Sequence, residues 1–413
     1  MSDLLTARIN SQRLWDSLMR MAEIGRTDKG GCNRQALTDE DRRGRDLFVS
    51  WARDAGCTVS VDQIGNIFAA RAGADSSAAP VWIGSHLDTQ PTGGRFDGVY
   101  GVMAGLEVVR TLNDMGCKTR RPIEIVSWTN EEGCRFAPAM LGSGVVSGAY
   151  ALEYAYSRVD KSGVTLGQEL ARIGYKGDRS ATSRVCRAVF EAHIEQGPIL
   201  EAAGTTIGAV QGIQGACWLD VTLKGVAAHA GPTPMEMRRD PWRVAAPLIQ
   251  HAFDIAARNA PWGRATIGNL KVTPGSRNTV PEQLIVSVDL RHPERATLDA
   301  MVMDLRESAR ALAAEHRVGV EIENVWTMPP TRFDPQLVSL IGKCATELGY
   351  STRTMISGAG HDSLHTAQFA PTAMIFVPCA GGLSHNEEES AKVEDLAAGA
   401  NVLLHSVLNA AND

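Results

Sequence analysis

The sequence predicts an α/β protein: a domain with a mostly parallel central sheet and flanking helices, interrupted by an inserted α+β domain. Two observations carry this prediction. Strand-like and helix-like segments alternate in the first and last parts of the chain, which is typical of a parallel sheet covered by helices. Between those parts lies a run of segments in a different order. A chain of 413 residues is also too long for one compact core and suits two domains.

The first part of the chain opens with an amphipathic segment, residues 1–25, which we expect to form the first helix. Three later segments are rich in β-branched and aromatic residues and are bounded by Gly or Pro, which predicts strands. They are residues 57–71, 79–88 and 121–133. Residues 98–116 carry apolar side chains at helical spacing, and Gly116 fits a helix C-terminal cap. Strands that alternate with helices in this way predict a mostly parallel sheet.

The pattern changes near residue 212. Residues 214–231 alternate like a half-solvated strand. The next segments predict a helix, two antiparallel strands joined by a loop, a second helix and a last strand. They are residues 240–259, 264–293, 295–317 and 319–327. We therefore place an α+β domain with a four-stranded antiparallel sheet and two helices at residues 212–328. The α/β pattern then resumes, so the first domain is expected to be discontinuous, residues 1–211 and 329–413.

The composition is ordinary for a globular protein, with 44% hydrophobic and 21% charged residues. The net charge of −6 is spread without long single-sign blocks, which argues against nucleic acid or an anionic membrane as the main partner. No apolar run approaches the roughly 20 residues that span a bilayer, and the start lacks a secretory apolar stretch. The eight cysteines are scattered without a C-x-x-C pair, which predicts reduced thiols in a cytoplasmic protein.

Side chains typical of metal sites stand at the end of the strand predicted in residues 79–88. His86 and Asp88 are two apart, so they should point the same way on a strand. A metal-bound imidazole usually donates its other N–H to a carboxylate or carbonyl, and Asp88 could supply that partner directly or by turning the backbone. Asp97 follows on a glycine-rich loop that can fall back over the strand end. Any one of these residues alone would be ordinary in a polar loop.

Further ligand types stand at other predicted strand ends: the pair Glu131 and Glu132, His193 and His385. Adjacent residues on an extended end point to different sides, so the two glutamates should have different roles. One can bind metal while the other faces the water that the metal activates. Together these residues predict a two-metal site with mixed oxygen and nitrogen ligands, suited to Zn²⁺, Mn²⁺, Co²⁺ or Ni²⁺.

This spacing resembles that of the dinuclear metal aminoacylase and carboxypeptidase clan. The stretches "FDGVYGV", "NEEGCRF", "HIEQGP", "AHAGPTPM" and "SHNE" further resemble its amidase branch. That branch contains N-carbamoyl-L-amino-acid hydrolases, metal-dependent β-ureidopropionases and allantoate amidohydrolases. The likeness covers essentially the whole chain. It implies a catalytic metal-binding domain, residues 1–211 and 329–413, interrupted by a lid domain at residues 212–328 that also forms a homodimer.

The resemblance also implies roles for the candidate ligands, with two divalent metal ions in each subunit. Asp97 would bridge the two ions, and each ion would take two further ligands. These pairs are His86 with His193, and Glu132 with His385. Glu131 would act as the general base that takes a proton from the bridging water and later delivers it to the leaving nitrogen. Asp88 would lie behind the ligands and orient His86.

Candidate substrate-binding residues stand mainly in the inserted domain. His229 lies in a turn rich in Gly and Pro, Asn278 lies in a loop, and Arg291 ends a strand. Taken singly, each fits a turn residue, an Asx-turn or a surface ion pair. The resemblance implies instead that His229 polarises the substrate carbonyl and that Asn278 and Arg291 bind the carboxylate region. It adds Gln196 and His361 as substrate contacts, and it implies that some lid groups come from the other subunit.

The resemblance predicts hydrolysis of the carbamoyl C–N bond of N-carbamoyl-L-amino acids. Residues 210–218 resemble carbamoylases and β-ureidopropionases more than allantoate enzymes, although all three substrates present a ureido group and a carboxylate. An N-acyl amino acid hydrolase, a peptidase and a non-catalytic binding relative are the remaining alternatives. Glu131 and every metal position are present, which argues against a non-catalytic relative. Cys134 follows Glu131 closely but is expected to be a packed small side chain.

Overall fold

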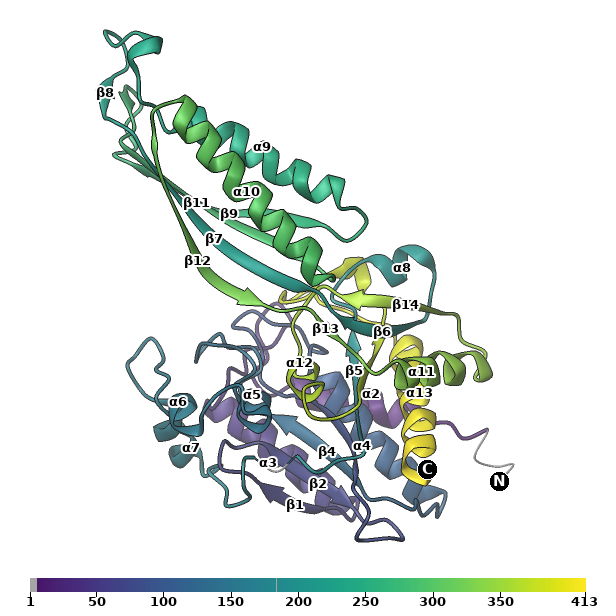
Figure 1. Cartoon of the computed structure of the whole chain (residues 1–413). Helices are drawn as coiled ribbons and strands as arrows, with labels where there is room; N and C mark the ends of the chain where they lie inside the picture. The colour runs from purple at the N-terminus through teal and green to yellow at the C-terminus, as the bar shows by residue number, and fades with distance from the viewer. Residues whose placement is uncertain (1–5, 183) are drawn as a thin grey trace. The chain divides into compact units, whose positions relative to one another are not determined.

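The computed structural model of the chain, shown in Figure 1, describes residues 6–182 and 184–413. The chain divides into two compact units. The first contains Met1–Gln211 and Arg332–Asp413, and the second contains Gly212–Thr331. The predicted fold class is confirmed, because the first unit holds a sheet with a parallel centre and the second holds a separate four-stranded antiparallel sheet.

The first unit is built on a nine-stranded sheet in the order β1-β2-β4-β3-β5-β15-β6-β13, with β14 paired to β6. Its strands are β1 (Thr58–Val61), β2 (Ile67–Arg71), β3 (Val81–His86), β4 (Ile123–Trp128), β5 (Ala188–Ile194), β6 (Ile207–Ile213), β13 (Thr331–Arg332), β14 (Thr352–Ser357) and β15 (Thr372–Val377). The four central strands β4, β3, β5 and β15 run parallel. Strands β2 and β6 join them antiparallel.

Helices cover both faces of this central sheet, which is why its strands are continuous apolar runs. Every residue of β3, β5 and β15 is buried. On one face, Gly105 of α4 (Val99–Asp114) leaves room for Ile83 and Ile125 of the sheet. On the other, Val146 of α5 (Leu141–Ser147) packs in one cluster with Trp82 and Trp128.

The remaining helices of the first unit lie around this core. They are α2 (Ser11–Ala22), α3 (Asp39–Asp54), α6 (Leu152–Tyr156), α7 (Leu166–Ile173), α8 (Ile199–Ala203), α11 (Pro335–Glu347), α12 (Ser363–Thr366), α13 (Val393–Asn412) and the 3₁₀ turn η2 (Ala380–Gly382). The apolar helix α13 packs on β15 and α4. Helix α12 packs against β5 and β15.

The second unit is a four-stranded antiparallel sheet, order β12-β7-β11-β9, with two helices on one face (Figure 1). Its elements are β7 (Gly215–Lys224), β8 (Ala228–His229), η1 (Met235–Met237), α9 (Trp242–Arg258), β9 (Arg264–Thr273), β10 (Thr279–Val280), β11 (Gln283–His292), α10 (Arg295–Glu315) and β12 (Gly319–Met328). Leu219, Val221 and Leu223 of β7 enter the helix-facing core, while the residues between them are more exposed. This alternation is typical of a sheet that is covered on one side.

One expected strand is wrong in detail. Residues 57–71 form two antiparallel strands, β1 and β2, rather than one. The turn between them is closed by a hydrogen bond of 3.0 Å from the N–H of Asp62 to the carbonyl of Asn66, and it holds Gly65 at a φ of +89°. A positive φ favours glycine, so this residue marks the turn.

The first helix begins at Ser11, where the Asn10 side chain accepts the N–H of Arg13. Residues 1–5 of the segment expected to form it lie outside the described residues. Within residues 6–182 and 184–413, no helix has the length and apolar character needed to cross a membrane.

Candidate metal centre

The candidate ligands gather where the parallel strands end. His86 is the last residue of β3, and it lies in register with Trp128, the last residue of β4. His193 of β5 lies opposite Phe376 of β15. The carboxyl ends of neighbouring parallel strands share one edge of the sheet, and functional groups collect there. The residues after β4 and β15, which include Glu131, Glu132 and His385, therefore leave the sheet at the same edge.

The two oxygens of Asp97 face two different groups of side chains. Its Oδ1 lies 3.2 Å from Nε2 of His193 and 3.6 Å from Nε2 of His86. Its Oδ2 lies 3.3 Å from Nε2 of His385, which in turn lies 3.4 Å from Oε2 of Glu132. One carboxylate thus stands between a two-histidine group and a histidine–glutamate group. Each group is compact enough to hold a metal ion, because its candidate ligand atoms all lie within 4.8 Å of one another.

Backbone carbonyls orient the two buried histidines. Nδ1 of His86 lies 2.9 Å from the carbonyl oxygen of Asp88, and Nδ1 of His193 lies 2.8 Å from that of Ile194. When each Nδ1–H donates to its carbonyl, each Nε2 keeps a lone pair that points toward Asp97. This is the arrangement that metal-bound imidazoles usually have.

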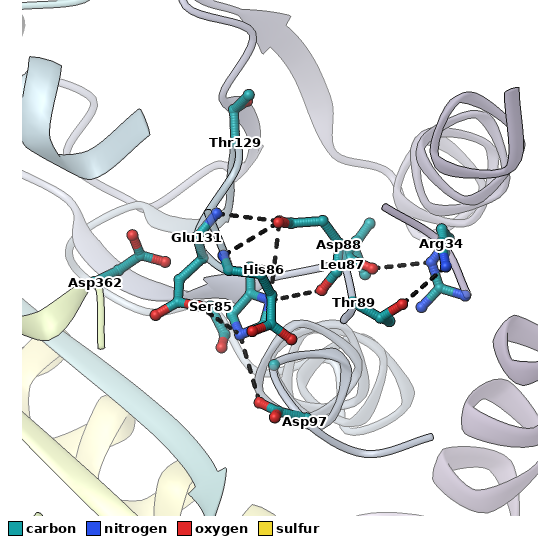
Figure 2. Close-up of polar contacts among 12 residues, drawn as sticks. Arg34, Ser85, His86, Leu87, Asp88, Thr89, Asp97, Thr129, Glu131 and Asp362 are labelled. Carbon is teal, nitrogen blue, oxygen red and sulfur yellow. Dashed lines mark hydrogen bonds and ion pairs between the residues drawn. The ribbon is translucent and has the colours of Figure 1, made fainter. Parts of the chain in front are cut away.

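Asp88 orients His86 through its backbone, while its carboxylate has a separate role. Oδ1 and Oδ2 accept the backbone N–H groups of Glu131 and Glu132, each at 3.2 Å. Figure 2 shows Asp88 between Glu131 and the turn that follows β3. Buried Arg34 holds this turn by donating Nε–H to the carbonyl of Leu87 at 2.9 Å. Asp88 therefore links the chain segment of His86 to that of the two glutamates.

Glu131 and Glu132 point to different neighbours, although they lie in a bend beyond the end of β4 at Trp128 rather than on an extended segment. Oε2 of Glu131 lies 3.5 Å from Nε2 of His86. The carboxylate of Glu132 faces His385 and accepts both the backbone and the side-chain N–H of Gln90, at 3.0 and 2.7 Å. Glu131 therefore lies beside the two-histidine group, and Glu132 belongs to the histidine–glutamate group.

The electrostatics of this cluster favour a bound cation. Burial raises the pKa of Glu132 to about 7, and the neighbouring Asp97 charge adds to the effect. The hydrogen bond to Asp97 raises the pKa of His385 to about 9, and burial opposes it. Burial alone would lower the pKa of His86, yet the charges of Glu131, Asp97 and Asp88 raise it well above its usual value. Closely packed carboxylates therefore attract positive charge to the imidazoles, and a divalent cation can supply that charge.

Known proteins are similar to this chain in both sequence and fold. Residues 82–409 match the profile of Peptidase family M20/M25/M40. The chain belongs to this family. An N-carbamoyl-L-amino-acid amidohydrolase from Rhizobium meliloti is 50% identical over 98% of this chain and 97% of that protein. An N-carbamoyl-L-amino acid amidohydrolase from Geobacillus stearothermophilus is 38% identical over 97% and 98%. A crystal structure of an amidase of the hydantoinase/carbamoylase family from Burkholderia multivorans is 52% identical, with a TM-score of 0.96 over 99% of both chains.

Two further predicted residues of this M20/M25/M40 chain border the cluster. Gln196, at a φ of +57°, donates Nε2–H to Oδ2 of Asp97 at 2.9 Å, while its buried Oε1 has no partner among the described residues. His361 is buried with its ring 4.6 Å from that of His193. Burial and the nearby His193 lower the pKa of His361 well below its usual value. A neutral imidazole and an open amide oxygen therefore flank the candidate ligands.

The other predicted substrate residues lie at two ends of the second unit. His229 of β8 pairs with Thr279 of β10, next to Asn278, and both predicted residues are exposed. Figure 1 shows β8 at one end of the four-stranded sheet. Arg291 lies toward the other end of β11, where it pairs with Asp289 at 2.7 Å. About 26 Å of strand separates Gln283, which begins β11, from Arg291. Within this unit, Arg291 is therefore remote from His229 and Asn278.

Sequence reasoning missed three residues that support the cluster: Gln90, Ser384 and Glu389. Gln90 holds Glu132, and Ser384 donates to Asp97 or to Glu389 at 3.0 Å. Gln90 and Glu389 stand within a few residues of recognised motifs, at the ends of "SHLDTQ" and "SHNEEE", but only the folded contacts distinguish them from ordinary loop residues. Cys134 is partly buried, with Sγ 3.5 Å from the carbonyl of Thr89, and burial raises its pKa to about 12.

Proposed function

We propose that this chain is an amidohydrolase that cleaves the carbamoyl C–N bond of N-carbamoyl-L-amino acids. One water is consumed, and the products are the free L-amino acid, CO₂ and ammonia, since the carbamate released first decomposes on its own. The observation that carries the proposal is the position of Asp97 between two ligand groups, with Glu131 beside one of them. The two curated relatives named for this substrate class support the choice of substrate.

Two divalent ions, Zn²⁺, Mn²⁺, Co²⁺ or Ni²⁺, are proposed for the two groups, with Asp97 bridging. Bound ions would lower the pKa of a water and polarise the substrate carbonyl. His86 and His193 would hold one ion, and Glu132 and His385 the other. The site fits such ions because its histidines present Nε2 and the candidate ligand atoms of each group lie within 4.8 Å of one another.

Glu131 is the proposed general base. Its backbone N–H is fixed by Asp88, and its carboxylate faces His86 rather than the group of Glu132. Burial raises the pKa of Glu131 well above that of an ordinary glutamate, which suits a group that takes a proton and gives it up again. The proton would come from the attacking water and go to the leaving nitrogen.

Substrate recognition is proposed to use Gln196 and His361 next to the ligands, and His229, Asn278 and Arg291 of the inserted unit. His229 would polarise the carbonyl, whereas Asn278 and Arg291 would bind the carboxylate. The long separation along β11 argues that one chain does not deliver all three to a single small substrate. We infer a homodimer in which the partner supplies one end of the inserted unit to each site.

The same site would also serve a β-ureidopropionase or an allantoate amidohydrolase. β-Ureidopropionate differs from an N-carbamoyl-α-amino acid by one methylene, which a pocket discriminates by only about 1–3 kcal/mol. An N-acyl amino acid hydrolase, a peptidase and a non-catalytic binding relative have less support. The names of the similar proteins favour the α-amino acid substrates.

The test compares the wild type with Glu131→Gln after reconstitution with each metal. Ammonia release is measured with N-carbamoyl-L-amino acids, their D-enantiomers, β-ureidopropionate and allantoate. The L-carbamoyl substrates should give the highest kcat/KM, and Glu131→Gln should lower it by about 10²–10⁴-fold while metal content is unchanged. A higher kcat/KM for another ureido substrate would change the assigned substrate but not the proposed site. Failure of the wild type on every one of these substrates would reject the ureido assignment, and N-acyl amino acids and dipeptides would be tested next.

A further inference from the structure

Three consecutive glutamates follow His385, and only the third is buried. Glu389 is 1% exposed, whereas the neighbouring Glu388 is exposed. No lysine or arginine pairs with Glu389 among the residues that the structure describes, although buried carboxylates usually require such a partner. Two of the residues that bind it, Phe96 and Asp97, lie 293 and 292 positions earlier in the chain.

The Glu389 carboxylate holds the backbone at Asp97. Its Oε1 accepts the N–H groups of Phe96 and Asp97, at 2.8 and 3.2 Å. Its Oε2 lies 3.0 Å from the hydroxyl of Ser384, and the same hydroxyl lies 3.0 Å from Oδ2 of Asp97. Glu389 thus connects the loop that carries Asp97 to the loop that carries His385.

The glycine-rich loop around Asp97 is shaped to admit this carboxylate. A Cβ atom at Gly94 would overlap the carboxyl group of Glu389. Any other residue at position 94 would therefore displace the glutamate or the loop. The glycine at this position provides space for a specific side chain, in addition to backbone freedom.

We propose that Glu389 is a positioning residue that sets the orientation of Asp97 between the two ligand groups. The inference rests on the proposed metal centre. His86 and His193 are oriented independently, by the carbonyls of Asp88 and Ile194. Ser384 and His385, which face Oδ2 of Asp97, lie on the loop that Glu389 connects to Asp97. Loss of the carboxylate should therefore lower the affinity for the ion at Glu132 and His385 more than the affinity for the ion at His86 and His193.

The first experiment titrates Co²⁺ into the metal-stripped full-length chain and follows the absorption of the bound ion. Glu389→Gln is compared with Glu388→Gln, which makes the same change one position earlier on an exposed side chain. Wild type and Glu388→Gln should bind two ions with the same affinities. Glu389→Gln should bind one ion with unchanged affinity and the other, at Glu132 and His385, about 10–100-fold more weakly. This is the usual effect of removing a group that supports a metal ligand. Two unchanged affinities in Glu389→Gln would overturn the inference.

Two further variants guard against a simple folding defect, which thermal melting of each protein would reveal. Ser384→Ala removes only the hydroxyl between Glu389 and Asp97. It should lower the affinity for the same ion, by a smaller factor than Glu389→Gln does. Gly94→Ala should reproduce the effect of Glu389→Gln, although Glu389 itself is intact. If Glu389→Gln does not fold, unchanged cobalt binding in both of these variants would overturn the inference.

The wild-type titration separates this inference from the proposed function. A wild type that binds no Co²⁺ would reject the metal centre and, with it, the role of Glu389. A wild type that binds two ions and whose Glu389→Gln variant does the same rejects only the role of Glu389.

Discussion

Gly98 lies directly beneath the imidazole of His86. A Cβ atom at this position would overlap Cε1 and Nε2 of the ring, and Gly98 also has a φ of +67°. Its backbone N–H reaches Nε2 of His193 at 3.1 Å. The residue after Asp97 must therefore be glycine for His86 to approach the aspartate, whereas the contact with His193 needs only a backbone N–H.

Gly98→Ala should displace His86 and reduce metal binding. The added methyl group cannot be accommodated beside a ring that is fixed by the Asp88 carbonyl. Metal content after dialysis, measured by atomic emission, should fall relative to wild type. Gly116→Ala is the matched control, because Gly116 has a φ of +59° but nothing within 4 Å of its added Cβ. Equal metal content in both variants would mean that the contact with His86 is unimportant.

Mixing two inactive variants should reveal which end of the inserted unit acts on the partner's site. Glu131→Gln is co-expressed with His229→Ala in one experiment and with Arg291→Ala in another. If one end acts on the partner's site, one pair should recover about a quarter of wild-type activity, because half the dimers are mixed and each has one intact site. The other pair should recover none. Recovery in both pairs, or in neither, would contradict the inferred division between the two ends.

The thiol of Cys134 should be inert despite its position three residues after Glu131. Burial raises its pKa to about 12, and only the thiolate reacts with alkylating agents. Mass spectrometry at pH 8 should find the Cys134 peptide unmodified by iodoacetamide in the native protein and modified after unfolding. Cys134→Ala should retain most of the kcat/KM of the wild type. Rapid alkylation with parallel loss of activity would contradict this expectation.

His365 should make the first unit sensitive to acid. Burial lowers its pKa to about 4, whereas an unfolded histidine titrates near 6.5. Between these values the unfolded chain binds a proton that the folded chain does not, so stability present above pH 6.5 is lost as the pH falls. At pH 4.5 the loss from this group would be about 2–3 kcal/mol.

The comparison for His365 is the pH dependence of Tm with and without His365→Gln, both in excess chelator so that metal loss does not contribute. The variant should show a smaller fall in Tm between pH 7 and 4.5 than the wild type. Parallel curves would show that His365 does not control the acid response.

The cluster of candidate ligands could be predicted because its residue types have strong chemical meaning and stand at the ends of predicted strands. The run that contains Ile83 predicts a strand that ends near His86. His86 is the last residue of β3 and His193 is the last but one of β5, and the chemistry of imidazole and carboxylate suggests a metal. The α/β pattern therefore predicts both the sheet and the edge where the ligands meet.

The supporting contacts could not be predicted because they depend on tertiary structure. Strand β3 ends at His86, so Asp88 lies beyond the strand and orients His86 through its carbonyl, one of the two routes that the sequence leaves open. Glu387, Glu388 and Glu389 are chemically identical in the sequence, and only the loop around Gly94 makes the last one buried. The turn at Asp62 likewise divides residues that share one strand-like composition into two strands.

The position of β15 between β5 and β6 has a consequence for synthesis on the ribosome. Its neighbours end at Ile194 and Ile213, but β15 begins at Thr372, and His385 comes later still. A nascent chain therefore carries an unpaired edge on β5 until these late residues emerge, and such edges promote aggregation. Neither the sheet nor the set of ligands is complete before then. Translation arrest before residue 372 would thus produce fragments that need chaperones and cannot assemble the site.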